Sequence, residues 1–189
     1  MSVAAADPLG KSSYSLFARI VHWLWLVLVV TLFILAWTAE LPPETPGGPP
    51  RFDPVLVTWH RSIGITVWLL TLARAIERRV AGKPAWPAGL PAWQRPASAM
   101  VHWALYVLLL TTPIFGYLAS NGFGETVNFY FLGNLPSVIE KNEDLAGQIY
   151  GLHDLAGTLI EILVGIHVLA ALYHQFVQKD AILRRMLRI

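Results

Sequence analysis

Residues 151–174, "GLHDLAGTLIEILVGIHVLAALYH", place three histidines inside a stretch that is otherwise almost entirely apolar. The stretch is long enough to cross a membrane, because a helix of about 20 residues spans a ~30 Å hydrocarbon layer. An imidazole buried in such a helix is costly unless its ring nitrogens have partners. The partners of His153, His167 and His174 therefore bear on both the fold and the function.

The overall composition indicates a membrane protein. Of the 189 residues, 55% are hydrophobic and 14% are charged, and the mean hydropathy is +0.51. Soluble globular domains carry about 25% charged residues, so a soluble chain of this composition would lack the polar side chains to cover its surface. The length fits a single domain.

Charge and cysteine content exclude several kinds of partner and cofactor. A net charge of +2 without a basic stripe gives no reason to expect a nucleic acid as partner. The chain has no cysteine, which excludes disulfides, thiolate-bound zinc, iron–sulfur clusters and covalently attached c-type haem. A bound metal ion must therefore be held by histidine, methionine or oxygen.

Four apolar runs of membrane-spanning length predict an all-α, integral membrane four-helix bundle. They cover residues 16–39, 55–76, 97–120 and 150–177, and the connections between them are rich in proline, glycine and charge. We expect a tail at 1–15, the four-helix domain at 16–178 and a basic tail at 179–189. The third connection is also considered as the place of a short surface helix.

The connections differ in charge, and this difference predicts the orientation in the membrane. Basic residues gather in the second connection and the C-terminal tail: Arg74, Arg78, Arg79, Lys83, Arg95, Lys179, Arg184, Arg185 and Arg188. The first and third connections carry mainly acidic residues: Glu40, Glu44, Asp53, Glu125, Glu140, Glu143 and Asp144. Because positive loops remain in the cytoplasm, both termini are predicted to be cytoplasmic.

The histidines fall at two depths in the predicted bundle. His60 and His153 lie near the outer ends of their helices, whereas His22 and His102 lie toward the cytoplasm. His167 follows His153 by fourteen residues, which places it ~21 Å deeper and close to the same helical face. One face of the fourth helix therefore presents imidazoles at both depths.

This arrangement predicts two haems stacked across the membrane, since each iron takes two axial histidines from facing helices in a bundle core. The outer pair is His60 with His153. The inner pair is His167 with either His22 or His102, and depth alone does not separate these two.

Glycines near the outer histidines are consistent with a flat cofactor. Gly64 and Gly157 each follow an outer histidine by four residues, where little side-chain bulk leaves room for a macrocycle. The alternative interpretation is close helix packing, which also favours glycine in membranes.

Four further polar residues in or near the spans need partners. Arg74 needs an anion, and the alternatives are a propionate of the inner haem and the cytoplasmic headgroups. Arg61, beside an outer histidine, is expected to meet an outer propionate, attract small anions or lie at the interface. His174 is expected near a quinone, a propionate or headgroups. Glu161 should be protonated or paired.

The chain resembles the bacterial cytochrome b561 family, which is related to the membrane cytochrome b subunits of hydrogenases and formate dehydrogenases. The resemblance is carried by four segments: "YSLFARIVHWLW" at 14–25, "WHRSIGITVWLLTLARAIERR" at 59–79, "PASAMVHWALYVLLLTTPIFGYLAS" at 96–120 and "HDLAGTLIEILVGIHVLAALYHQFVQKDAILRRML" at 153–187. The last of these is the most specific.

The resemblance implies haem ligands and supporting residues. It implies an inner haem b held by His22 and His167, and an outer one held by His60 and His153. Supporting roles near the inner haem or a quinone then fall to His102 and His174, and Arg74 matches an arginine that serves a propionate.

The resemblance also implies electron transfer between a membrane quinone and a second redox partner. Some members oxidise superoxide outside the membrane and reduce ubiquinone, so we expect a multi-pass protein of the bacterial inner membrane with superoxide or a periplasmic protein as donor. The alternative is a membrane anchor and electron conduit for a separate dehydrogenase or hydrogenase. A histidine-rich transporter is a third hypothesis, but the halves show no internal repeat of the kind common in carriers. Pairing of two copies in the membrane is also considered.

Overall fold

The computed structural model describes residues 13–45, 51–82, 84–86, 89–180 and 182–187. Its elements, in chain order, are α1 (Leu16–Ala39), β1 (Glu40–Leu41), β2 (Arg51–Phe52), α2 (Pro54–Ala81), α3 (Gln94–Gly122), α4 (Glu143–Tyr173), the π-helical turn η1 (His174–Gln178) and α5 (Arg184–Leu187). Most of the predicted N-terminal tail (1–12), together with Lys83 and Arg188, lies outside the described residues.

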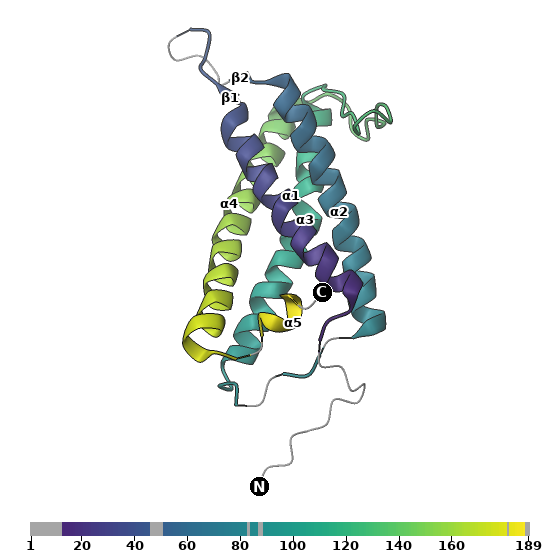
Figure 1. The fold of residues 1–189 in the computed structure, drawn as a ribbon. Helices are drawn as coiled ribbons and strands as arrows, with labels where there is room; N and C mark the ends of the chain where they lie inside the picture. Colours follow the sequence, from purple (N-terminus) through teal and green to yellow (C-terminus); the bar gives the residue numbers. More distant parts are fainter. Residues whose placement is uncertain (1–12, 46–50, 83, 87–88, 181, 188–189) are drawn as a thin grey trace.

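The prediction of an all-α membrane bundle is confirmed. Four of the described helices are long and apolar enough to cross a membrane, the last of them counted through Gln178, and they run along one another as a bundle (Figure 1). Many of their large apolar side chains are exposed on the outside of the bundle. A lipid environment accommodates such a surface, whereas water does not.

The helix starts follow ordinary capping chemistry. Side-chain oxygens of Ser15, Asp53 and Asn142 accept hydrogen bonds from backbone amides two or three residues on, at the starts of α1, α2 and α4. These residue types are favoured at N-caps because they satisfy amides that have no partner within the helix. Pro54 occupies the first position of α2, and Gly82, with φ of 69°, follows its last residue. Both placements are typical of helix ends.

The four helices do not pack evenly. The most extensive backbone contact is of α3 with α4, then of α1 with α2 and of α2 with α3. By contrast, α4 makes few close backbone contacts with α1 or α2. A small buried cluster of Val29, Val67 and Ile160 joins α1, α2 and α4 near the middle of the bundle.

The two ends of the described chain lie at the same end of the bundle as the connection between α2 and α3 (Figure 1). The indole of Trp23 donates to the carbonyl oxygen of Met186 at 3.1 Å, and Arg185 donates to the carbonyl oxygen of Ala85 at 2.6 Å. These bonds tie the C-terminal segment to α1 and to that connection.

Two expectations about the outer side need correction. The fourth helix begins at Glu143, seven residues before the predicted start, because the polar residues of its first turns resemble a loop although acidic side chains are favoured at a helix N-terminus. The surface helix considered for the third connection is absent from the wholly described segment 123–142, where the regular pairing is one bridge between Asn128 and Asn134. Glycines with positive φ at 124 and 133 interrupt any helix there.

Candidate functional site

The outer histidines face each other across the bundle. The ring centroids of His60 on α2 and His153 on α4 lie 6.1 Å apart, with the ring planes inclined by 71°. The Nδ1 atom of His60 lies 3.1 Å from the carbonyl oxygen of Leu32, and that of His153 lies 2.9 Å from the carbonyl oxygen of Thr112. A carbonyl oxygen can only accept, so both Nδ1 atoms donate and both Nε2 atoms keep a free lone pair. This is the usual arrangement of a metal-ligating histidine.

Three histidines meet at the inner end. The ring of His167 on α4 lies 6.0 Å from that of His22 on α1, with planes inclined by 67°. It also lies 5.1 Å from the ring of His102 on α3. The Nδ1 atom of His102 donates to the carbonyl oxygen of Ser98 at 2.6 Å. His22 and His102, the two alternatives for the partner of His167, therefore both lie beside it, but at different distances.

Two imidazoles bound to opposite sides of one metal ion, each at about 2 Å, place their ring centroids about 6 Å apart. The separations of 6.1 Å between His60 and His153 and 6.0 Å between His22 and His167 fit this requirement. The separation of 5.1 Å between His102 and His167 is shorter than the distance of about 6 Å that a shared metal ion requires. The residues present thus fit two bis-histidine haem sites, and the fit favours His22 in the inner one.

The glycines near the outer pair lie in open space. A Cβ atom added at Gly64 or Gly157 would meet no atom within 4 Å, so neither glycine is needed for close packing in this structure. This favours the cofactor interpretation over close helix packing. Gly116 of α3 is different, because a Cβ atom there would lie 2.9 Å from the Cε1 and Nδ1 atoms of His153. Sequence reasoning missed Gly116, since no spacing relates it to His153.

Arg74 is buried, with 5% of its surface exposed, and forms an ion pair with Glu77 one turn later on α2. The hydroxyl of Ser15 at the start of α1 donates to the other carboxylate oxygen of Glu77 at 2.5 Å. Contact of Arg74 with lipid headgroups, one of the two alternatives from the sequence, does not agree with this burial. The carboxylate of Glu77 supplies the anion that Arg74 needs. The spacing of three residues was a signal for Glu77 that the sequence analysis did not use.

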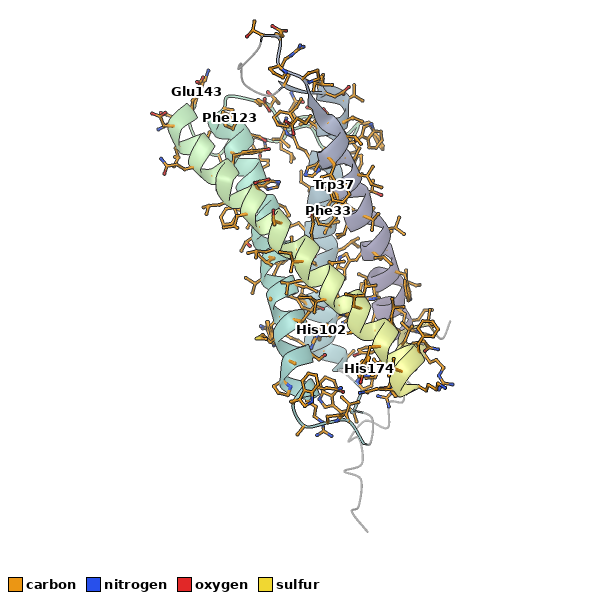
Figure 2. The ribbon with its side chains drawn as sticks, turned by 90° about the vertical axis from the view of Figure 1, so that its left-hand side faces the viewer. Phe33, Trp37, His102, Phe123, Glu143 and His174 are labelled. Atoms are coloured by element: carbon orange, nitrogen blue, oxygen red, sulfur yellow. The ribbon has the colours of Figure 1, made fainter. Side chains whose placement is uncertain are left out.

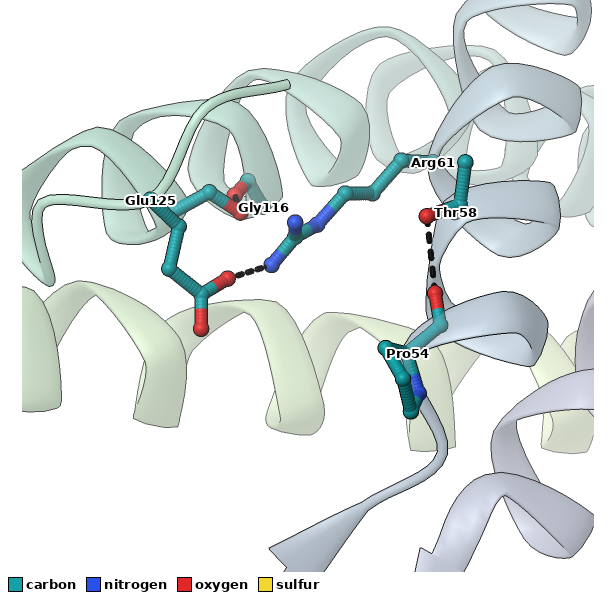
Figure 3. Close-up of polar contacts among 6 residues, drawn as sticks. Pro54, Thr58, Arg61, Gly116 and Glu125 are labelled. Atoms are coloured by element: carbon teal, nitrogen blue, oxygen red, sulfur yellow. Dashed lines mark hydrogen bonds and ion pairs between the residues drawn. The ribbon is translucent and has the colours of Figure 1, made fainter. Parts of the chain in front are cut away.

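Arg61 reaches from α2 to Glu125, which follows α3, and forms an ion pair with its carboxylate (Figure 3). The segment that contains Glu125 is fastened to α2 near this point. The hydroxyl of Ser62 donates to the carbonyl oxygen of Asn128 at 3.2 Å and accepts from the amide of Tyr130 at 3.0 Å. The partner of Arg61 thus comes from a loop far away in sequence.

His174 and His102 lie toward the same end of the bundle, as Figure 2 shows. The Nδ1 atom of His174 lies 2.6 Å from a carboxylate oxygen of Asp180, and 14% of the His174 side chain is exposed. Glu161, between the two levels of histidines on α4, is half-buried and forms no hydrogen bond or ion pair with any residue in the described part of the chain. Asp180 is a partner that the sequence analysis did not identify.

Comparison with known proteins gives one consistent result. The family model for prokaryotic cytochrome b561 matches residues 13–188. "Cytochrome b561 homolog 1" of Escherichia coli K12 is 29% identical over 167 residues, covering 88% of this chain and 92% of that protein. "Probable superoxide oxidase CybB" of Yersinia pestis is 32% identical over 170 residues, covering 88% and 91%. "Cytochrome b561 homolog 2" of Escherichia coli K12 is 29% identical over 175 residues, covering 92% and 90%.

The matched region includes all four membrane helices and all six histidines. Membership of this family implies haem b as the cofactor, in agreement with the histidine geometry and the lack of cysteine. The chain is therefore a multi-pass membrane protein that belongs to the prokaryotic cytochrome b561 family.

Proposed function

We propose that this chain binds two haem b groups and transfers electrons from superoxide at the outer face of the bacterial inner membrane to ubiquinone at the inner end. The observation that carries the proposal is the pair of histidine sites at two levels of α4, with centroid separations of 6.1 Å and 6.0 Å. The relative from Yersinia pestis named as a probable superoxide oxidase supports the choice of donor.

In this proposal His60 and His153 hold the outer haem, and His22 and His167 hold the inner one. Haem b, when bound, supplies reversible one-electron transfer at a potential tuned by its axial ligands. The carbonyl oxygens of Leu32 and Thr112 fix the tautomer and direction of the outer imidazoles, which orients the ligands and raises their basicity. The buried apolar cluster of the bundle keeps water out between the two levels.

The overall reaction balances in electrons and protons. Two superoxide ions each lose one electron and leave as dioxygen, and ubiquinone takes up these two electrons with two protons to become ubiquinol. The polar groups suited to the quinone are at the inner end: His102, and His174 with its Asp180 partner. An imidazole bonded to a carboxylate can hold and release a proton there.

A first prediction tests the space beside the outer histidines. Gly157→Val is expected to lower the haem-to-protein ratio of the purified protein, because the added side chain enters open space on the histidine-bearing face of α4. The ratio is measured as the pyridine haemochrome. Gly147→Val is the matched control: it also replaces a glycine of α4 with open space around it, but at an exposed site near the helix start. Equal ratios in the two variants would contradict the prediction.

The function is tested with purified protein in liposomes that contain ubiquinone, with superoxide generated enzymatically outside them. We expect ubiquinol to form with about two superoxide ions consumed per ubiquinol, by the electron balance of the couple, and superoxide dismutase to abolish it. Ubiquinol formation no faster than with heat-denatured protein would refute the function.

One observation favours a second candidate function, that of an electron conduit for a separate oxidoreductase subunit. The outer loop exposes the side chains of Phe131 and Leu132, with 94% and 70% of their surface accessible, and exposed apolar groups of this kind are typical of protein contacts. Copurification of a dehydrogenase or hydrogenase, lost in the Phe131→Ser variant, would support this candidate. Full superoxide-dependent activity of the isolated chain would count against it.

A further inference from the structure

The cations on the outer side of the bundle are all neutralised. Three basic side chains lie on this side in the described part of the chain, and each is bound to a carboxylate: Arg51 to Glu44, Arg61 to Glu125 and Lys141 to Glu143. Five further acidic residues belong to the same side: Glu40, Asp53, Glu140, Asp144 and Asp154. Among the described residues, the outer face therefore offers no uncompensated positive charge to an approaching anion.

Of these three cations, Arg61 is the one next in sequence to an outer histidine. It follows His60 directly on α2, and 21% of its side chain is exposed, compared with 51% for Arg51 and 61% for Lys141. A cation in this position is the natural attractor for a small anion that must reach the outer histidines.

Glu125 is held in place at the same site. Its amide donates to the carbonyl oxygen of Ser120 at 2.9 Å, and the hydroxyl of Ser120 donates to the carbonyl oxygen of Gly116 at 2.9 Å. Gly116 is the residue whose α-carbon lies against the His153 ring. The backbone of Glu125 is thus tied to the end of α3, one turn after the residue that contacts one outer histidine. Its carboxylate binds Arg61, which follows the other outer histidine in the sequence.

We propose that Glu125 determines specificity at the outer site: by neutralising Arg61, it slows the approach of small anions, superoxide included, to the outer histidine pair. The proposal rests on the superoxide oxidation proposed above, because it concerns the donor at that same site. Removal of the carboxylate leaves Arg61 as an uncompensated cation. Local positive potential of this kind raises the encounter rate of anions and lowers that of cations, and salt weakens both effects.

The test compares two small ions of opposite charge as oxidants of the reduced holoprotein. Ferricyanide is a trianion and tris(phenanthroline)cobalt(III) a trication, and both take one electron. The protein is placed in liposomes with its outer face outward, reduced with dithionite, and mixed with either oxidant in a stopped-flow spectrometer. Each rate constant is measured at low and at high salt, and the superoxide-dependent rate of ubiquinol formation is measured in parallel.

In Glu125→Gln at low salt, the rate constant for oxidation by ferricyanide is expected to rise about three- to tenfold. The rate constant for oxidation by the cobalt complex is expected to fall by a similar factor. Both changes should become smaller at high salt. Glu140→Gln is the matched control, because it removes the same charge from the same loop at an exposed position with no Arg61 contact. The side chain of Glu125 is itself 54% exposed, so the difference expected between the two variants comes from position and not from burial. Glu140→Gln leaves the ion pair of Arg61 with Glu125 intact, and it should change either rate constant by less than about twofold.

The possible results separate the two proposals. If Glu125→Gln leaves the ratio of the two rate constants unchanged, or if Glu140→Gln changes it equally, the role of Glu125 is overturned even where superoxide supports ubiquinol formation. If the ratio changes as expected but superoxide supports no ubiquinol formation in any variant, the control of anion access by Glu125 is supported, and the superoxide function fails.

Discussion

Replacement of His153 by alanine is expected to leave about one haem b per chain in place of the two proposed for the wild type, since each iron needs two axial imidazoles. His153 is the partner of His60 at 6.1 Å, and no other histidine lies at that level of the bundle in the described residues. The inner histidines belong to a different level of α4 and should retain their haem. Transfer of electrons from an outer donor to ubiquinone should be abolished, because the outer site is the entry point in the proposed function.

The measurement is a reduced-minus-oxidised visible spectrum together with haem quantitation on wild type and variant. His174→Ala is the matched control, since it removes an imidazole from the same helical segment at the inner end, where Asp180 rather than a second imidazole binds its Nδ1 atom. The control should keep both haems. Retention of both haems in His153→Ala, or loss of both, would contradict the assignment of His153 as an axial ligand of one site.

The levels of the histidines were predictable because they follow from local rules. Hydropathy located the spans, and the constant rise of a helix placed His153 and His167 at two depths on one face of α4. In the structure His60 lies at the depth of His153. His22 and His102 both lie at the depth of His167. Depth fixes position along the bundle axis but not rotation of a helix about its own axis, so the choice between His22 and His102 could not be made from the sequence without the family resemblance.

The charge partners of the site were not predictable in the same way. Glu125 reaches Arg61 only because an irregular loop folds back onto α2 through bonds to Ser62. No hydropathy pattern or periodicity encodes such a loop path. Gly116 lies against His153 because of how α3 and α4 cross, which depends on packing of whole helices. Glu77 differs from both, because its spacing from Arg74 is local and could have been used.

The inner site gives the second prediction of large effect: His22→Ala should lose the inner haem, whereas His102→Ala should keep it. Both residues lie beside His167, at 6.0 Å and 5.1 Å between ring centroids. A shared iron requires about 6 Å between centroids, which only His22 satisfies. The Nδ1 atom of His102 donates to the carbonyl oxygen of Ser98 on its own helix, as the Nδ1 atoms of the outer histidines also do with carbonyl oxygens. The choice of His22 therefore depends on the centroid separation.

Haem quantitation and low-temperature electron paramagnetic resonance on both variants provide the measurement. His22→Ala should show about half the haem of the wild type and lose one of the two low-spin bis-histidine signals. His102→Ala should keep both signals, with a shifted potential of the inner haem, because a neighbouring dipole is removed while the ligands remain. The reverse result, with haem lost in His102→Ala and kept in His22→Ala, would make His102 the axial ligand. It would then place the inner haem between α3 and α4, the two helices with the most extensive backbone contact in this structure.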